Sequence, residues 1–216
     1  ITNKISNIFH KFATKEFPTT IQNIINNGYV KLLGLDMSEF NDASSYKTLN
    51  KLFTRALKTP REIDHSIDNF ISPADSFVSE AGYIQGDTAL QIKGMSYSVK
   101  DLLTDEITND NYEKLKDGNF MNFYLSPKDY HRYHLNFNCQ ITKLIHVPGK
   151  LYPVNFTYLN KQENLFIENE RAIMECITSD GKLFYMVFVG ALNVGKMVFN
   201  FEPKVNTNSN VVDTQV

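Results

Sequence analysis

The sequence stretch richest in groups that can do chemistry is YLSPKDYHRYH, residues 124–134, with an aspartate, two histidines and three tyrosines. His131 and His134 are two of the five histidines in the chain of 216 residues. A neutral imidazole can bind a metal ion or accept a proton near pH 7. The pair can therefore be interpreted as metal ligands, as a catalytic base with its neighbour, or as residues that stabilise a loop.

A metal site at this pair would need further ligands from elsewhere in the chain. Histidines three positions apart can share a ligand site if they lie on a helix. Asp129 is the nearest carboxylate in the sequence, but no HExxH motif, cysteine cluster or second paired-histidine segment accompanies it. We therefore expect no metal.

Nucleophilic catalysis needs a base, a carboxylate that orients it, and a hydroxyl or thiol. Asp75, in the segment ISPADSF, lies at an expected strand end or turn and could orient a histidine. Ser76 and Ser126 are hydroxyl candidates by position only, because the chain has no GxSxG motif. A soluble hydrolase that uses Asp75, His134 and a serine of this chain is one candidate function.

The bulk composition is that of an ordinary globular protein, with 42% hydrophobic residues, 21% charged residues and a net charge of -2. This weak charge gives no overall field that would attract nucleic acid. Cys139 and Cys176 form neither a disulfide framework nor a zinc pattern, so we expect free thiols. No apolar run reaches the roughly 18 residues that a membrane span needs, and no secretory signal is visible.

The N-terminal region, residues 1–35, has the period of two amphipathic helices. Apolar residues of the first helix fall within an arc of roughly 100°, and lysines flank it; the two groups are Ile1, Ile5, Ile8, Phe9 and Phe12, and Lys4, Lys11 and Lys15. We expect Pro18 to end this helix and Thr19 or Thr20 to cap the next. With four lysines against one glutamate, the region suits either a membrane interface or packing on its own domain.

The rest of the chain predicts one more helix and then short strands. Residues 46–57 have helical period, a brief helix is expected at 98–107, and strands are expected at 119–127 and 135–145. Turn pairs at Gly86–Asp87 and Asp180–Gly181 punctuate this part, and the second pair predicts a hairpin. We expect residues 206–210 to be poorly ordered. The fold class is α+β, with N-terminal amphipathic helices followed by a mostly antiparallel β body.

Seven segments, in order, resemble the phosphatidylserine decarboxylase family across nearly the whole chain. They are YKTLNKLFTRALK (46–58), SPADSFVSEAG (72–82), QIKGMSYSVKDLL (91–103), FYLSPKDYHRYH (123–134), VPGKLYPVN (147–155), NLFIENERAIM (164–174) and VGALNVGKM (189–197). The resemblance implies a proenzyme that cuts itself at a Gly-Ser bond, after which the serine becomes a pyruvoyl group on a small α chain. This chain would be the large β chain.

The resemblance also assigns roles to three residues. Asp75 aligns with the aspartate of the family's Pro-Ala-Asp motif, and His134 aligns with the second histidine of its Asp-Tyr-His-x-x-His motif. In the family these two form a charge relay with the cleavage serine. We assign His131 to the return of a proton during turnover. The pyruvoyl group would form a Schiff base with phosphatidylserine, release CO2 and leave phosphatidylethanolamine.

The chain departs from the family pattern in two places. The Gly-Ser-Thr cleavage sequence is absent from these residues, so the pyruvoyl-forming serine and the C-terminal end of the β chain are expected outside them. Asn136 stands where family members commonly have proline, so the loop after His134 could follow another path. An alternative function is an inactive homologue that binds anionic phospholipid.

The complete expectation is a carboxy-lyase with catalytic residues Asp75, His131 and His134, and with no metal. Residues 1–60 would form a helical membrane-associating region and residues 61–216 a β-rich catalytic domain. The partners would be the pyruvoyl-bearing α chain, phosphatidylserine and an anionic membrane surface, but no nucleic acid. Family resemblance suggests a homodimer of processed pairs. The protein would be peripheral, on the cytoplasmic face of a bacterial inner membrane.

Overall fold

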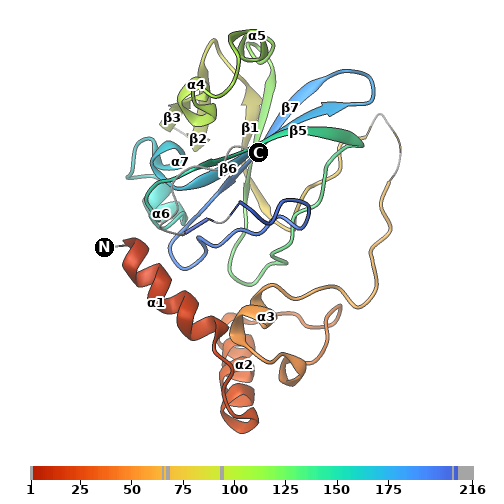
Figure 1. Ribbon diagram of the computed structural model, residues 1–216, viewed down its shortest axis with the longest axis vertical. Helices are drawn as coiled ribbons and strands as arrows, with labels where there is room; N and C mark the ends of the chain where they lie inside the picture. The colour runs from red at the N-terminus through yellow and green to blue at the C-terminus, as the bar shows by residue number, and fades with distance from the viewer. Residues whose placement is uncertain (1, 65, 67–68, 93–94, 206, 209–216) are drawn as a thin grey trace. The chain divides into compact units, whose positions relative to one another are not determined.

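A computed structural model describes residues 2–64, 66, 69–92, 95–205 and 207–208 (Figure 1). Its helices are α1 (Thr2–Thr14), α2 (Thr19–Leu33), the 3-10 helix η1 (Ala43–Ser45), α3 (Leu49–Phe53), α4 (Val99–Leu103), α5 (Asn109–Glu113), α6 (Phe156–Leu159) and α7 (Leu165–Glu168). Its strands are β1 (Phe77–Tyr83), β2 (Thr88–Ile92), β3 (Met95–Ser98), β4 (Asn119–Tyr124), β5 (Cys139–Val147), β6 (Arg171–Thr178) and β7 (Leu183–Val189). Helices α1–α3 precede the antiparallel sheets, and short helices α4–α7 lie between strands, which confirms the predicted α+β class.

The chain forms two compact units. The first consists of Ile1–Ile8, Val78–Asn122 and Cys139–Val216, and the second of Phe9–Phe77 and Phe123–Asn138. All three predicted site residues belong to the second unit, so the contacts within that unit position them.

Two predictions concern the functional division of the chain and residues outside the described ranges. The functional division into residues 1–60 and 61–216 concerns membrane association and catalysis, and it stays a prediction. In the segment for which poor order is predicted, residues 206, 209 and 210 lie outside the described residues, as does Ile1 of the first amphipathic helix.

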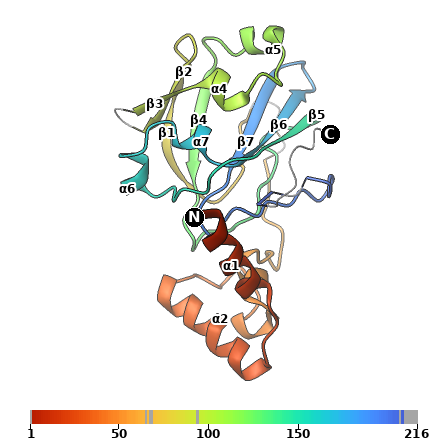
Figure 2. The ribbon, with the colours of Figure 1, turned by 60° about the vertical axis from the view of Figure 1, so that its left-hand side comes forward.

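The first unit is built on an antiparallel sheet with strand order β5–β6–β7, which Figure 2 shows edge to edge with its hairpin. Gly181 makes the predicted turn between β6 and β7 with a φ of 82°, a conformation that glycine adopts without steric cost. Alternate residues of β6 face opposite sides of the sheet. Ile173 packs in a core with α4, whereas Ala172 and Met174 pack in a second core with Phe188 and Phe199.

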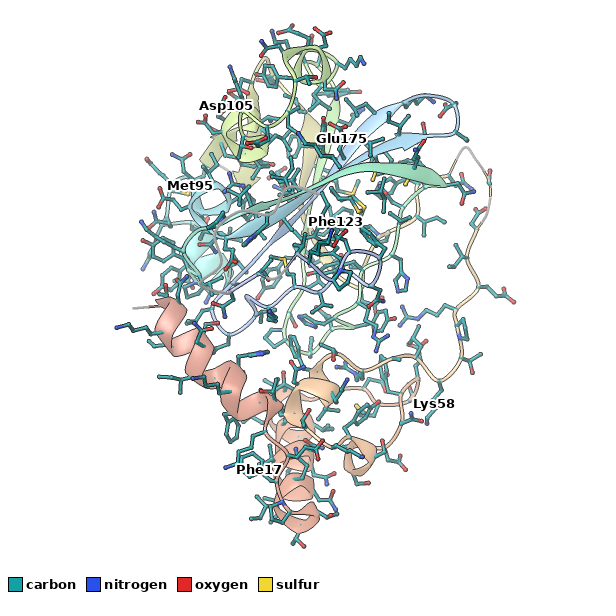
Figure 3. All side chains as sticks on the ribbon, viewed as in Figure 1. Phe17, Lys58, Met95, Asp105, Phe123 and Glu175 are labelled. Atoms are coloured by element: carbon teal, nitrogen blue, oxygen red, sulfur yellow. The ribbon has the colours of Figure 1, made fainter. Side chains whose placement is uncertain are left out.

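A carboxylate on β6 links the sheet to α5. Glu175, labelled in Figure 3, accepts hydrogen bonds from Asn111 (3.0 Å), Thr142 (2.8 Å) and Tyr185 (2.5 Å). Burial by itself would raise the pKa of Glu175, but the hydrogen bonds from Tyr185, Thr142 and Asn111 bring it below its ordinary value. The folded sheet therefore keeps this carboxylate ionised.

The second unit is held together by α2 and α3. Leu49 and Leu52 of α3 are buried beside Ala13, and partly buried side chains of α2 pack against them. Asn26 of α2 is fully buried, and its amide donates to the carbonyl oxygens of Ala43 (2.9 Å) and Tyr46 (2.8 Å). These bonds satisfy a buried polar side chain and fasten the 43–46 segment to α2.

The structure corrects two predicted helix boundaries at α1 and α2. The first helix ends at Thr14, before Pro18, and Pro18 itself occupies the N-cap of α2 without a side-chain cap. The predicted capping role of Thr19 or Thr20 is therefore wrong, because Thr19 is already helical.

Two further boundaries are corrected at α3 and β5. The helix predicted over 46–57 covers only Leu49–Phe53, because Thr48 caps its start through a hydrogen bond from Lys51 N (3.1 Å). The strand predicted from residue 135 begins at Cys139. The residues before it belong to the loop that carries the histidines.

Candidate functional site

Both histidines lie in an irregular loop, residues 125–138, between β4 and β5. A local turn begins the loop, since Asp129 accepts a hydrogen bond from the Ser126 backbone (2.6 Å) and donates its own amide to the Ser126 carbonyl (2.9 Å). The helical spacing that would let His131 and His134 share a metal is therefore not realised. Among the residues that the structure describes, no group of three histidine, cysteine or carboxylate side chains could hold a metal ion.

His131 is half-buried and has one nitrogen committed to the loop itself. Its Nδ1 lies 2.9 Å from the Asp129 carbonyl oxygen, and its ring lies 4.0 Å, centroid to centroid, from that of Phe53. Burial lowers the pKa of His131, and the Asp129 hydrogen bond opposes this shift without reversing it. Nε2 has no hydrogen-bond partner among the described residues. The residue is thus a neutral imidazole with one free nitrogen.

His134 is exposed and is held by its backbone and by a tyrosine. Its amide donates to the Pro73 carbonyl oxygen (2.8 Å), which joins the histidine loop to the segment that carries Asp75. Its Nε2 lies 3.2 Å from the Tyr130 hydroxyl, and the two rings are stacked with centroids 5.7 Å apart. A second backbone bond, from Ile71 N to Asn136 O (3.3 Å), continues this junction.

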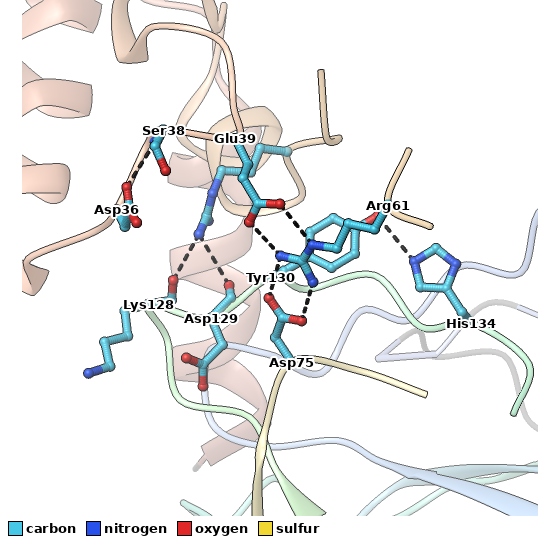
Figure 4. Close-up of polar contacts among 10 residues, drawn as sticks. Asp36, Ser38, Glu39, Arg61, Asp75, Lys128, Asp129, Tyr130 and His134 are labelled. Atoms are coloured by element: carbon cyan, nitrogen blue, oxygen red, sulfur yellow. Dashed lines mark hydrogen bonds and ion pairs between the residues drawn. The ribbon is translucent and has the colours of Figure 1, made fainter. Parts of the chain in front are cut away.

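Asp75 is paired with an arginine (Figure 4). Arg61 donates to both of its carboxylate oxygens, at 2.6 and 3.0 Å, and to both oxygens of Glu39, at 2.9 and 2.7 Å. The hydrogen bonds to Glu39 and Asp75 raise the pKa of Arg61. Among the described residues no hydrogen bond joins Asp75 to His134; the structure brings their segments together through Pro73 but leaves the side chains apart.

The two serines that were candidates by position have other partners. The Ser76 hydroxyl lies 3.4 Å from the Ala74 carbonyl oxygen, and the Ser126 hydroxyl accepts from the Lys128 amide at 3.4 Å. Neither serine forms a hydrogen bond with His131 or His134 in the described part of the chain. This arrangement gives no support to a hydrolase that draws its nucleophile from Ser76 or Ser126.

Sequence reasoning missed the residues that hold the site, namely Glu39, Arg55, Arg61 and Tyr130. Arg55 is buried and donates to carbonyl oxygens of the histidine loop, whereas Arg61 holds Asp75. Arginine and glutamate are usually exposed, so a sequence pattern offers no signal that a particular one is a structural partner. Tyr130 lies within the histidine stretch, and its position next to His131 was the only available hint.

Several apolar side chains of the N-terminal helices are exposed to solvent. On α2, Ile24 is 69% exposed and Leu32 is 83% exposed, and on α1 Ile8 is 70% exposed. At about 100° per residue, Ile21, Ile24 and Leu32 fall on one face of α2, opposite the face that contains buried Asn26. No helix in the described part of the chain has the length and apolar character needed to cross a membrane.

Comparison with known proteins places these features in context. A model of the family named phosphatidylserine decarboxylase matches residues 49–212. A phosphatidylserine decarboxylase proenzyme of Helicobacter pylori is 43% identical over 216 residues, which is 100% of this chain and 79% of that protein. The proenzymes of Campylobacter jejuni and Marinobacter nauticus are 43% and 35% identical, each over 211 residues, and the chain covers 77% and 73% of their lengths.

Proposed function

The chain belongs to the phosphatidylserine decarboxylase family, and from this membership we propose that it is the large chain of a self-processing enzyme that decarboxylates phosphatidylserine to phosphatidylethanolamine and CO2. The observation that carries the proposal is the similarity to named proenzymes over the full chain. These names support an active decarboxylase and give no support to the alternative of an inactive lipid-binding homologue. The proposed class is a pyruvoyl-dependent carboxy-lyase.

Self-cleavage needs a base that takes the proton of a serine hydroxyl. We assign this role to His134, which is exposed and whose backbone is anchored at Pro73. Asp75 orients the ring and stabilises the imidazolium. For this Asp75 must accept from His134 in addition to Arg61, and Nε2 must exchange the Tyr130 hydroxyl for the serine. The serine oxygen then attacks the preceding carbonyl carbon, the C–N bond breaks, and the serine nitrogen leaves as an amine with the proton that His134 returns. The resulting ester separates the chains when elimination releases the upstream chain as a carboxylate.

The residues of this chain fit a pyruvoyl group on a partner chain. Such a group, when present, supplies an electron-withdrawing carbonyl for the decarboxylation of an amine substrate. A neutral imidazole with a free nitrogen suits the accompanying proton transfer, and His131 has one in Nε2. His131 therefore takes a proton at Nε2 from the ammonium group of the substrate and returns it in place of the lost carboxylate, while its Nδ1 stays bonded to Asp129.

We further propose that the protein binds a membrane peripherally, on the cytoplasmic face. The exposed apolar face of α2 and the basic character of residues 1–35 suit an interface of acyl chains and anionic headgroups. The other proposed partners are phosphatidylserine, the small α chain and a second processed pair that completes a homodimer.

The intact mass of the expressed full-length polypeptide tests the proposal. We expect two chains, the smaller blocked to N-terminal sequencing by its pyruvoyl end. His134→Ala and Asp75→Asn should each leave one uncut chain, whereas His131→Ala should be cut but decarboxylate poorly. Normal cutting of His134→Ala would remove the charge-relay assignment. An uncut wild-type chain that still releases CO2 from phosphatidylserine would contradict the whole scheme.

A further inference from the structure

We propose that Arg55 is a positioning residue that fixes the orientation and tautomer of His131 by holding the Asp129 carbonyl. The inference rests on the proposed proton-transfer role of His131. Arg55 itself is assigned no contact with substrate.

The burial and partners of Arg55 show where its charge is directed. Arg55 follows α3 and is only 2% exposed, so its guanidinium needs acceptors inside the protein. Nη2 donates to the Lys128 carbonyl oxygen at 2.8 Å and to the Asp129 carbonyl oxygen at 3.4 Å. The guanidinium carbon also lies 4.4 Å from the centroid of the Phe40 ring. No carboxylate of the described residues forms an ion pair with Arg55, so its hydrogen bonds are directed to the histidine loop.

The Asp129 carbonyl is shared between Arg55 and His131. His131 Nδ1 lies 2.9 Å from this oxygen, and a carbonyl oxygen can only accept. Neutral His131 therefore carries its hydrogen on Nδ1, and the lone pair falls on Nε2. The position of this carbonyl decides which nitrogen is free, and Arg55 is the side chain that also donates to it.

Three consecutive residues, 53 to 55, each contact the histidine loop. The Phe53 ring contacts the His131 ring, the Thr54 carbonyl oxygen accepts from Arg132 Nε at 3.0 Å, and Arg55 holds the two carbonyls. The end of α3 and the two residues after it thus hold in place a loop that lies more than 70 residues further along the chain. Arg55 supplies the buried, charge-assisted hydrogen bonds among these contacts.

The charged groups that act on His131 are few. Burial lowers the pKa of His131 most, the Asp129 backbone bond and carboxylate raise it, and Arg55 lowers it. The Phe53 ring that packs on it from α3 carries no charge. Loss of Arg55 should therefore raise the His131 pKa, through the lost positive charge and through easier entry of water.

Nuclear magnetic resonance of full-length protein with 15N-labelled histidine rings tests the inference without relying on activity. The variants are Arg55→Met and Arg55→Lys, with Lys51→Met as a control for loss of an exposed charge on α3, the helix that precedes Arg55. His131→Gln assigns the signals. In Arg55→Met we expect a smaller share of the Nδ1–H tautomer and a higher titration midpoint for His131. Arg55→Lys keeps the positive charge but replaces the planar guanidinium with a compact, strongly hydrated ammonium, so it should shift in the same direction by less.

Activity gives the second readout. The decarboxylation rate of Arg55→Met should fall by about tenfold or more, while self-cleavage through His134 continues. The acidic limb of its pH–rate profile should move to higher pH. If Arg55→Met does not fold, Arg55→Lys decides alone. A wild-type tautomer and midpoint for His131 in the folded variants would overturn the inference. If wild-type protein releases no CO2, the proposed function fails. The NMR measurement of the His131 tautomer and titration midpoint still tests the positioning role of Arg55.

Discussion

Arg61 and Asp75 form a two-pronged ion pair, with guanidinium nitrogens 2.6 and 3.0 Å from the two carboxylate oxygens. An ionised carboxylate offers about four lone-pair sites. Two of these sites bind Arg61, so Asp75 can accept another donor such as the His134 ring without losing the arginine. The pair therefore fixes the orientation of Asp75 and leaves it able to serve the histidine.

Arg61→Lys should slow self-cleavage, because a single ammonium cannot hold both oxygens of Asp75. The side chains of Arg61 and Asp75 are 40% and 38% exposed, so the change should lower the free energy of unfolding by no more than about 1 kcal/mol. Time courses of chain cleavage and urea unfolding would measure the two effects. Glu39→Gln is the control, since it leaves the Asp75 contacts in place and should cleave nearly normally. Wild-type cleavage by Arg61→Lys would contradict the orienting role.

The pH dependence of stability should contain a contribution from His131. Its pKa is lowered in the folded protein, chiefly by burial, so the unfolded chain binds the proton more readily. The associated stability is complete above the unfolded pKa of about 6.5 and is lost as the pH falls through the lower folded value. Urea unfolding between about pH 5 and pH 8 should show a smaller acid loss for His131→Gln than for wild type. Parallel curves for the two proteins would speak against burial of a neutral ring.

The exposed apolar face of α2 should determine membrane affinity. Ile24→Glu and Leu32→Glu place a negative charge on that face, and we expect each to weaken binding to vesicles of anionic phospholipid by about tenfold. Asn27→Glu is the matched control, since it adds the same charge to an exposed polar position of the same helix. Sedimentation with vesicles measures the affinity. Equal losses in all three variants would indicate charge repulsion and not insertion of apolar side chains.

The first unit contains a buried histidine that the proposed chemistry does not use. His146 Nε2 lies 2.7 Å from Glu170 Oε1, both side chains are almost completely buried, and the Asn208 amide donates to the same oxygen. His146→Leu should lower the free energy of unfolding by about 3–5 kcal/mol, because the Glu170 carboxylate loses its side-chain partner. The double variant His146→Leu with Glu170→Leu should be more stable than the single one. Denaturant unfolding would measure both, and a less stable double variant would rule out this explanation.

Elements that depend on nearby residues were predictable. The Asp180–Gly181 hairpin is confirmed, and Gly181 supplies the positive φ in the short loop that Thr178 and Lys182 close with a backbone hydrogen bond. The helix predicted over residues 46–57 was too long at both ends. Thr48 caps its start, and beyond its last residue Arg55 forms hydrogen bonds with the histidine loop. Periodicity reports which residues could face a core, but contacts across the fold decide where an element stops.

By itself the sequence determined the α+β class, the main turns, the family and the stretch that contains His131 and His134, because local spacing and ordered motifs carry that information. Tertiary structure alone decided that Asp75 pairs with Arg61, that His134 meets Tyr130, and that Arg55 reaches the Asp129 carbonyl. The Arg55 and Arg61 partners come from separate parts of the chain, and packing brings them within hydrogen-bond distance. A carboxylate or carbonyl accepts from any donor that packing presents, so its partner is a property of the folded chain.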